Sequence, residues 1–357
     1  MEILSESKYH VDIIQWRDFE IIHYYDEKNN IYIESSGNQF SISVADKVHK
    51  FTIPVNPVKK LLLKFRITRR LFRLDKSNAV FNKDGTAIIV LFLGNIYRYE
   101  LSTRKCVHTG TLRQCRNVLH QGICVTPEGH IIFGEYGSNV QRDSVPIWIS
   151  KDDGFTWQIA YEFSKGKIKH VHGVYFDHFT QDLWIPTGDF DGECYLVRAD
   201  TEFNTIKRYG DGTQQWRPVS LFFTENSIIW GMDSQLETNF LKKFNRRSEQ
   251  LEAGQDLPGP VWYSKQLNDG VALLQTTREI GPGVKTDYVH IFLSQNLADW
   301  HEISRYRKDH YPMKFFKYGV LSFADGDQSS KSFAIHGEGL KGFDGRSAIA
   351  RIVATSE

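Results

Sequence analysis

The clearest indication of the fold is PIWISKDDGFTWQIAYEF, at residues 146–163. It contains two short runs of β-branched and aromatic residues, which predict strands at 146–150 and 156–161. Between them, SKDDGFTW (150–157) has the composition of a tight turn, in which an Asp side chain caps backbone N–H groups and a Gly takes a positive φ. The stretch therefore predicts two neighbouring strands of one sheet, with Trp157 packed into the core.

Related patterns recur on both sides of this stretch. Units at 118–163, 169–210 and 214–254 each begin with a strand and a turn, continue with a strongly apolar strand and a polar loop, and end with two further strands. Weaker copies before and after them give seven units of about 51 residues, near the length of a propeller blade. The sequence predicts an all-β protein: a β-propeller of seven four-stranded blades, with six as the alternative, forming one domain over 1–357.

The turn resembles the Asp-box (S-x-D-x-G-x-T-W) of sialidase-like propellers. The matching residues are Ser150, Asp152, Gly154, Thr156 and Trp157, and a degenerate copy stands at 293–300. The resemblance implies a turn that stabilises the fold at a distance from the ligand. Residues 167–247 also look like poorly characterised BNR-repeat, glycosyl-hydrolase-like propellers, although the Arg-Ile-Pro motif of true sialidases is absent.

Charge and composition narrow the functional classes. The formal net charge is +1, which argues against a general nucleic-acid binder. The Lys- and Arg-rich stretch 59–76 is the local exception; it is interpreted as a solvated strand pair with basic edges, and a groove for a polyanion is the alternative.

The sequence shows no feature of export or membrane insertion. Residues 1–15 lack a basic segment followed by a long apolar one, and the longest apolar run, 87–93, is too short to span a bilayer. The four cysteines form no Cys-x-x-Cys pair and are expected to be reduced thiols. We therefore expect a cytoplasmic protein that does not interact with membranes.

Propeller geometry predicts which polar residues share a face. Residues that precede the first strand of each blade, and those between its second and third strands, should surround the central channel on one face. The catalytic candidates at these positions are His120, His172, Asp189 and Asp233. The substrate-binding candidates are Arg73, Glu135, Tyr136, Arg217, Trp262, Tyr263 and Arg278.

Three ionisable residues occupy equivalent positions in successive units: His120 in HQGIC, His172 in HGVYF and Arg217 in RPVSL. Ionisable groups that face a narrow channel are costly unless they are paired or used, so these positions predict either a functional site or a structural polar plug. Arg217 could clamp a carboxylate or sulfate, or instead bridge blades by pairing with Asp189 or Asp233.

The histidines, carboxylates and aromatic candidates suggest particular roles. His120 and His172 could be general bases or metal ligands, or channel histidines bonded to neighbouring loops. Asp189 and Asp233 could form the acid/base pair of a glycosidase. Trp262 and Tyr263 suit stacking on sugar rings, although core packing is the simpler explanation for at least one of them.

No cofactor is predicted. The carboxylates of DFDGE (189–193) resemble the start of a calcium loop without its full spacing, and a histidine site for manganese or zinc is a further alternative. The sequence GEGLKG (337–342) matches a dinucleotide-binding fingerprint only by accident, because no helix follows it.

These observations favour a glycoside hydrolase-like enzyme that acts on an acidic sugar or oligosaccharide at the channel. The alternatives are a non-catalytic propeller that binds a glycan or protein, and a polysaccharide lyase that acts on uronates. No nucleic-acid partner is expected.

Overall fold

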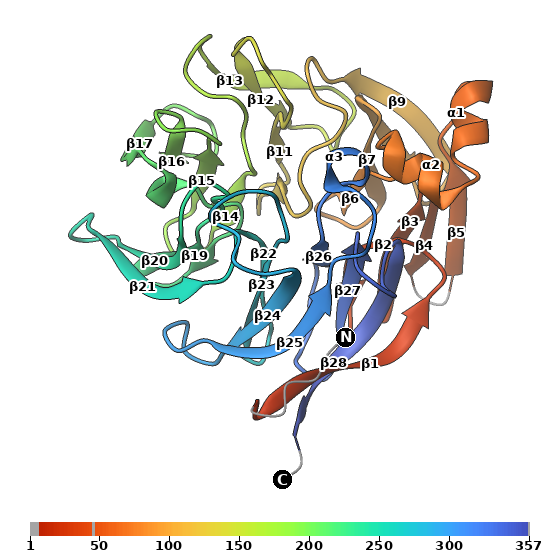
Figure 1. Cartoon of the computed structure of the whole chain (residues 1–357). Helices are drawn as coiled ribbons and strands as arrows, with labels where there is room; N and C mark the ends of the chain where they lie inside the picture. The colour runs from red at the N-terminus through yellow and green to blue at the C-terminus, as the bar shows by residue number, and fades with distance from the viewer. Residues whose placement is uncertain (1–6, 45–46, 356–357) are drawn as a thin grey trace. The chain divides into compact units, whose positions relative to one another are not determined.

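The computed structural model describes residues 7–44 and 47–355. Its strands form seven four-stranded sheets, the blades of a β-propeller, as predicted (Figure 1). The chain divides into two compact units, one built from residues up to Asp75 and from Ile229 on, the other from Lys76–Ile228. Each unit is described by itself.

The unit Lys76–Ile228 contains three complete antiparallel sheets whose strands follow one another in sequence order. The first consists of β6 (Ser77–Phe81), β7 (Ala87–Phe92), β8 (Asn95–Glu100) and β9 (Lys105–Thr111). The second consists of β10 (Ile123–Val125), β11 (Ile131–Gly134), β12 (Val145–Ser150) and β13 (Gln158–Phe163). The third consists of β14 (Tyr175–Asp177), β15 (Asp182–Thr187), β16 (Cys194–Ala199) and β17 (Ile206–Gly212).

The other unit contains three further sheets. Two follow sequence order: β2 (Ile21–Asp26), β3 (Ile31–Ser36), β4 (Gln39–Val44) and β5 (Lys47–Thr52), and β22 (Val261–Gln266), β23 (Ala272–Thr276), β24 (Tyr288–Ser294) and β25 (His301–Arg307). The third is made of β26 (Val320–Phe323), β27 (Phe333–Glu338), β28 (Arg346–Ala354) and β1 (Tyr9–Arg17).

The seventh sheet is β18 (Phe222–Phe223), β19 (Ser227–Gly231), β20 (Asn239–Asn245) and β21 (Leu251–Leu257), and the boundary between the two units falls within β19. A short 3-10 helix, η1 (Gln214–Trp216), precedes it. The α-helices are short: α1 (Pro57–Leu62), α2 (Arg66–Leu71) and α3 (Met313–Phe316). Among the described residues, no helix is long and apolar enough to cross a membrane.

The sheet that contains β26, β27 and β28 takes its outer strand, β1, from the N-terminal part of the chain. β1 pairs with β28 in antiparallel register, with His10 opposite Val353 and Arg17 opposite Ser347, so the first and last described strands lie side by side (Figure 1). Hydrogen bonds between these strands tie the two ends of the chain together within one sheet. The repeat pattern had not revealed this strand.

Burial changes across each sheet. Every residue of the second strands β7 (AIIVLF) and β23 (ALLQT) is buried, whereas the fourth strands β17 and β21 are largely exposed. In the unit Lys76–Ile228, Ile132, Ile147 and Leu183 pack together between neighbouring sheets. This explains why second strands are continuous apolar runs, which were the clearest sequence signal.

The turn 150–157 joins β12 to β13, the third and fourth strands of their sheet. The Asp152 carboxylate accepts hydrogen bonds from Ser150 Oγ (2.9 Å), the Thr156 backbone N–H (2.9 Å) and Thr156 Oγ1 (2.6 Å). Gly154 has φ +84°, and a Cβ there would collide with Ile89 of the preceding sheet. The octapeptide is therefore a turn held by its own side chains and packed against the neighbouring sheet.

The related turn at 293–300 uses an amide in place of the carboxylate. Asn296 Oδ1 accepts the backbone N–H groups of Ala298 and Asp299, both at 2.9 Å, and Trp300 is buried. It joins β24 to β25, which are again the third and fourth strands.

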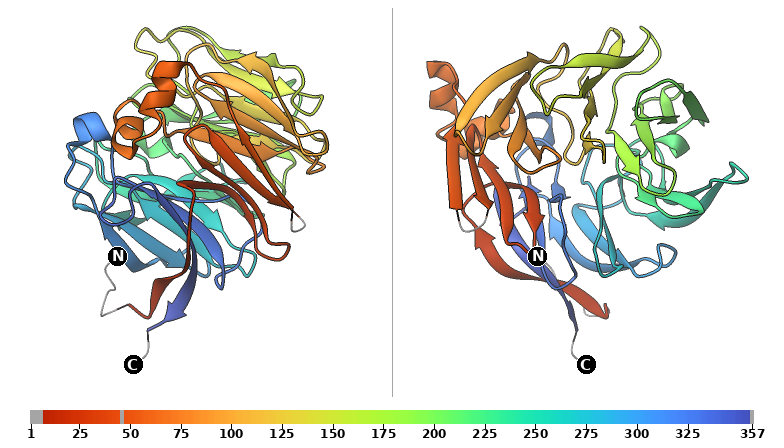
Figure 2. Two further views of the ribbon diagram at one scale, coloured as in Figure 1. Left: turned by 90° about the vertical axis from the view of Figure 1, so that its right-hand side faces the viewer. Right: turned by 180° about the vertical axis from the view of Figure 1, so that it is seen from behind.

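The prediction of a strand pair at 59–76 is wrong, because this stretch forms α1 and α2 (Figure 2). Asn56 caps α1 by accepting the Lys59 N–H (2.9 Å), and Pro57 stands at the first helical position, where its fixed φ suits a helix. The residues between them and Lys76 are mostly Leu, Lys and Arg, which are good helix formers. The positive charge of this stretch had suggested the edges of strands. The Asn56 cap and the helix propensity of the residues instead favour helices.

Candidate functional site

Two histidines stand on the extended segment that precedes β14. The His172 N–H donates to Pro186 O (2.9 Å) and the Val171 N–H to Glu135 O (3.0 Å), so the segment is fixed between the ends of β11 and β15. His170 and His172 are both 1% exposed. One residue separates them on an extended backbone, so both side chains project to the same side. Their ring centroids lie 5.1 Å from each other.

Backbone carbonyls determine which nitrogen of each ring carries a proton. His170 Nδ1 lies 2.8 Å from Gly137 O, and His172 Nδ1 lies 2.7 Å from Pro218 O. A carbonyl oxygen can only accept, so both Nδ1 atoms are donors. In a neutral ring the lone pair is then on Nε2, which is the arrangement that holds metal-binding histidines in orientation.

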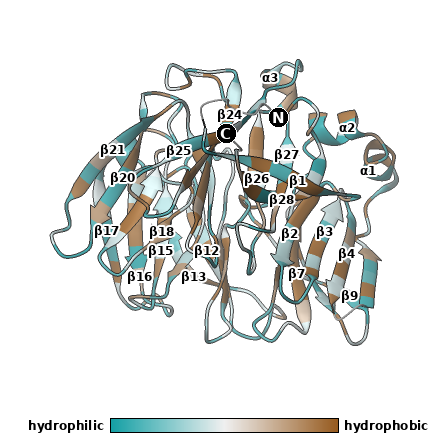
Figure 3. Cartoon of the chain, turned by 90° about the horizontal axis from the view of Figure 1, so that it is seen from below, coloured by the Kyte–Doolittle hydropathy of each residue, from teal (hydrophilic) through white to brown (hydrophobic). Residues whose placement is uncertain are grey.

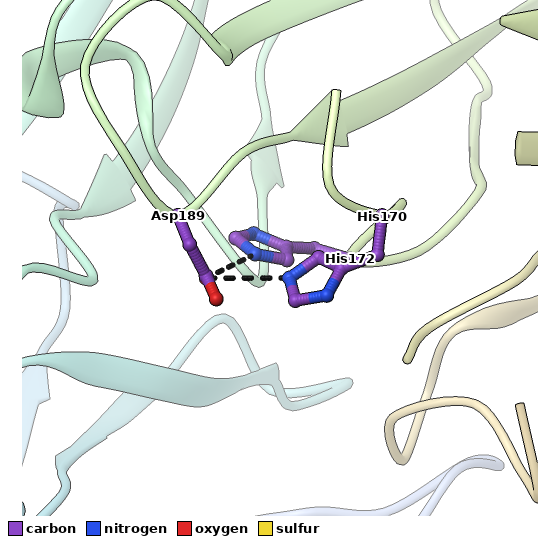
Figure 4. Close-up of side chains that lie close together, drawn as sticks. All are labelled: His170, His172 and Asp189. Carbon is purple, nitrogen blue, oxygen red and sulfur yellow. Dashed lines mark hydrogen bonds and ion pairs between the residues drawn. The ribbon is translucent and has the colours of Figure 1, made fainter. Parts of the chain in front are cut away.

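Both Nε2 atoms point to one oxygen of Asp189, in the loop after β15 (Figure 4). The distances to Oδ1 are 3.2 Å from His170 and 3.4 Å from His172. The other oxygen, Oδ2, accepts from the Lys169 ammonium. If both imidazoles were neutral, their Nε2 lone pairs would face the negatively charged carboxylate, which is unfavourable. A proton on Nε2 or a cation between the three groups would remove this repulsion.

Arg217 completes the cluster from the segment after η1. Its Nη2 donates to Asp189 Oδ1 (2.8 Å), and its Nη1 donates to the Asp189 backbone carbonyl (3.0 Å) and to Gln214 Oε1 (3.2 Å). The side chain is 4% exposed. The bond to Asp189 is the pairing considered for Arg217 from the sequence.

The cluster keeps Asp189 ionised. Burial by itself would raise the pKa of this carboxyl, but His170, His172 and Arg217 hold the pKa well below its usual range. A carboxylate with this environment does not donate a proton near neutral pH. Asp189 is thus suited to binding cations and poorly suited to acting as the general acid of a glycosidase.

The same three residues have the geometry of a metal site. The ligand atoms of His170, His172 and Asp189 all lie within 4.8 Å of one another. Two imidazoles and one carboxylate form a donor set used by divalent first-row metals, and the carbonyl bonds to Nδ1 are the expected outer contacts. Lys169 and Arg217 already neutralise the carboxylate, so a divalent cation here would leave excess positive charge for an anionic ligand to balance.

Aromatic side chains lie beside the cluster. The half-buried Tyr136 ring lies 4.2 Å from the His170 ring, between centroids. Phe190 is 44% exposed, and the Lys169 ammonium lies 5.4 Å from its ring centroid. Exposed or partly exposed rings next to cationic groups suit the apolar face and the charged substituent of an acidic sugar.

Other predicted residues of this unit have different surroundings. The Glu135 carboxylate accepts the N–H groups of Arg113 and Gln114 (both 2.7 Å) and the indole N–H of Trp148 (2.9 Å). These bonds fix the loop that follows β9. His120 is 6% exposed and lies in the segment before β10, the position equivalent to that of His172 before β14.

Asp233, Trp262 and Tyr263 belong to the other unit. The Trp262 indole donates to Asp233 Oδ1 (2.9 Å), and Asp233 is 3% exposed in the loop after β19. Tyr263 is 1% exposed and packs in the core, so of the two predicted aromatics only Trp262 retains partial exposure. The predicted partners Asp189 and Asp233 lie in different units.

Arg278 and Arg73 are surface residues of that unit. Arg278 donates to Asp287 Oδ1 through Nε (3.0 Å) and Nη2 (2.9 Å), in a cleft of about 520 Å³. Arg73 is exposed and follows α2, with φ +58°. The repeat alignment placed it at the start of a strand, whereas β6 begins only at Ser77.

Sequence reasoning selected His172, Asp189 and Arg217, but it selected neither His170 nor Lys169. The signal was present, since Lys169 opens the segment KHVHG, in which three cationic or titratable residues fall within four positions. No pattern in the sequence indicates that Gly137 and Pro218 supply the carbonyls that orient the rings.

No protein-family model and no curated protein sequence matches the chain. Solved structures do match its fold. The crystal structure of oligogalacturonate lyase from Vibrio parahaemolyticus matches with a TM-score of 0.59 and 10% identity, over 100% of this chain and 96% of that one.

A chain in the crystal structure of the mitotic checkpoint complex matches with a TM-score of 0.55 and 8% identity, over 97% of this chain and 95% of that one. An extracellular domain ascribed to a one-component system from B. thetaiotaomicron gives a TM-score of 0.53 and 11% identity, over 95% of this chain and 40% of that one. These proteins differ in function, so the likeness establishes the propeller fold and leaves the activity open.

Proposed function

We propose that this protein is a carbohydrate-active propeller that takes an acidic sugar or oligosaccharide at the cluster of Lys169, His170, His172, Asp189 and Arg217. The observation that carries the proposal is the charge of the cluster. One carboxylate faces an ammonium and a guanidinium, and two imidazoles turn toward the same carboxylate. An anionic group of a ligand would balance the remaining positive charge.

Elimination at a uronate fits these residues better than hydrolysis. Hydrolysis by two carboxyl groups requires a protonated carboxyl as the general acid, but Asp189 stays ionised and the five-residue cluster contains no second carboxyl. In an elimination, a base takes the proton from the carbon next to the sugar carboxylate, and a carbon–carbon double bond forms as the glycosidic carbon–oxygen bond breaks. The departing oxygen then takes a proton from the protonated base or from water. Cationic groups around the sugar carboxylate stabilise the charge that develops on it. The oligogalacturonate lyase of similar fold is named for a uronate substrate, which agrees with this choice.

His170, His172 and Asp189 would hold a divalent metal ion in this site. When bound, such an ion would act as a Lewis acid toward an anionic oxygen of the ligand. Lys169 and Arg217 would orient the Asp189 carboxylate by occupying its two oxygens.

The test is turnover of acidic and neutral oligosaccharides, with added manganese, zinc or calcium and after chelation, with products identified by mass spectrometry. We expect an unsaturated product from a uronate oligosaccharide, and its loss in His172→Ala and Arg217→Ala. His178→Ala and Arg208→Ala are the matched controls, because both residues are exposed, His178 in the turn between β14 and β15 and Arg208 on β17. A product whose mass has increased by one water molecule would show that the reaction is a hydrolysis and that the proposed elimination is wrong.

Binding is measured separately by calorimetry with the same oligosaccharides. Affinity for uronate oligosaccharides without any product would identify a non-catalytic glycan-binding propeller. Absence of both binding and turnover in the folded protein would refute the proposed function.

A further inference from the structure

The helices α1 and α2 and the turn between them carry an unusual surface. Of the large apolar side chains that are exposed anywhere in the described chain, six fall within fifteen residues: Val58, Leu61, Phe65, Ile67, Leu71 and Phe72. Val58 is 68%, Phe65 58% and Leu61 57% exposed. Figure 3 shows hydrophobic and hydrophilic residues alternating along α1 and α2. An apolar surface of this kind on a folded protein marks an interaction site.

The charges between these apolar residues are all positive. Residues 57–73 contain no Asp or Glu, and Lys60, Lys64 and Arg73 are exposed. Within the described ranges, neither Lys60 nor Lys64 forms an ion pair. The outward side of the two helices is therefore apolar and cationic, with no carboxylate to compete for a partner.

Half-buried arginines hold the helices in place from the other side. Arg69 pairs with Glu20, and Arg66 pairs with Asp75 (2.9 Å) and Asp344 (2.8 Å). These pairs divide the basic residues of 57–73 into two groups: arginines that anchor the helices, and residues that face solvent. Substitutions in the second group should leave the anchor intact.

The surface continues onto α3. Arg70 is 2% exposed and donates to Phe316 O (2.6 Å), which ties α2 to α3. On α3, Lys314 and Phe315 are exposed, so an apolar and a cationic side chain are again adjacent. Figures 1 and 2 show the three helices close together.

A cationic cleft adjoins α3. It has a volume of about 520 Å³ and includes Met313 of α3 in its lining. Four of its side chains are basic and two are acidic: Arg278, Arg307, Lys308 and Lys341, and Asp287 and Asp309. A cleft with this excess of positive charge suits an anionic group of modest size.

We propose that α1, α2 and α3 form a surface that binds the interface of an anionic membrane. Exposed Leu, Ile and Phe side chains would enter the boundary between headgroups and acyl chains, while the flanking lysines extend to the anionic headgroups and the adjoining cleft accepts one of them. An anionic lipid surface complements both properties of the site, because its acyl chains can accept the apolar side chains and its headgroups carry negative charge. The proposal is independent of the sugar site, and it runs against the expectation from the sequence that the protein does not interact with membranes.

The test is co-sedimentation of the purified full chain with phosphatidylcholine vesicles, with and without phosphatidylserine. We expect binding only to the phosphatidylserine vesicles, weakened by raised salt. Replacing Lys60 and Lys64 by Glu should lower the partition coefficient by more than about tenfold, since each cation near an anionic surface contributes roughly fivefold. Leu61→Ser with Phe65→Ser should lower it by about tenfold or more.

Val140→Ser with Lys167→Glu is the matched control, because both residues are exposed elsewhere on the chain. Its binding should equal that of the wild type, and thermal melts verify that every variant is folded. Equal binding to vesicles of both compositions, no binding, or binding that the 60–65 variants leave unchanged would overturn the proposal. Sedimentation analysis showing a dimer that Phe65→Ser dissociates would assign the surface to a second copy instead.

Discussion

Replacing Asp189 by Asn tests whether the Asp189 carboxylate balances the positive charges of the cluster. The substitution keeps the size of the side chain and removes its charge, which leaves Lys169 and Arg217 without their counter-charge; Arg217 is 4% exposed. Breaking a buried ion pair by removing one partner costs about 3–5 kcal/mol. Over 357 residues the entropy of unfolding is roughly 0.75 kcal/mol/K, so Tm should fall by about 4–7 °C if the chain unfolds in one transition.

The control is Asp182→Asn, in which a carboxylate 2.8 Å from Arg198 Nε is lost at a more exposed site. An exposed ion pair is worth about 0–1 kcal/mol, and Tm should change by roughly 1 °C or less. Both variants are compared with the wild type by differential scanning calorimetry after chelation. A Tm for Asp189→Asn equal to that of Asp182→Asn would refute the argument that the cluster depends on a buried carboxylate.

The acid side of the stability profile provides a second measure. Because the folded state lowers the pKa of Asp189, its contribution is present above the pKa of the unfolded carboxyl and is lost as the pH falls through the folded value. Asp189→Asn should therefore lose most stability near neutral pH and approach the wild type at strongly acidic pH. A constant difference between the two proteins at all pH values would contradict this.

Three further predictions concern the scaffold. Gly154→Ala should destabilise the protein by about 1–3 kcal/mol, measured by urea unfolding, because its φ of +84° and the side chain of Ile89 leave no room for a Cβ; an unchanged midpoint would show that the turn can adapt. Burial lowers the pKa of His23 to about 3, with His336 adding to the shift, so stability should decline as the pH falls from about 6.5 toward 3, and His23→Gln should flatten that decline in calorimetric scans. Burial raises the pKa of the Cys124 thiol to about 12, so iodoacetamide should label it in urea and leave it unmodified in the native protein, as peptide mass spectrometry would reveal.

The sequence could predict the blades because each sheet is built from local signals. Continuous apolar second strands such as β7 and the turn at 150–157 depend on neighbouring residues only, so seven units were visible in the chain. The strand β1 was not visible, because it completes a sheet whose other strands lie at the opposite end of the chain. The helices in 59–76 were not predicted, because the stretch was interpreted from its charge; the cap at Asn56 and Pro57 at the first helical position are the local signals for a helix there.

The all-β repeat architecture follows from the amino-acid pattern alone, and the repeat selected His172, Asp189 and Arg217 as equivalent or neighbouring positions in the blades. The fold of the whole chain brings the His172 and Arg217 side chains to one oxygen of Asp189 and Lys169 to the other. It also decided that the carbonyls of Gly137 and Pro218 turn both Nε2 atoms inward. This difference arises because strand periodicity is set by local backbone geometry. The charge and protonation of a buried cluster depend instead on groups that folding brings together from distant segments of the chain.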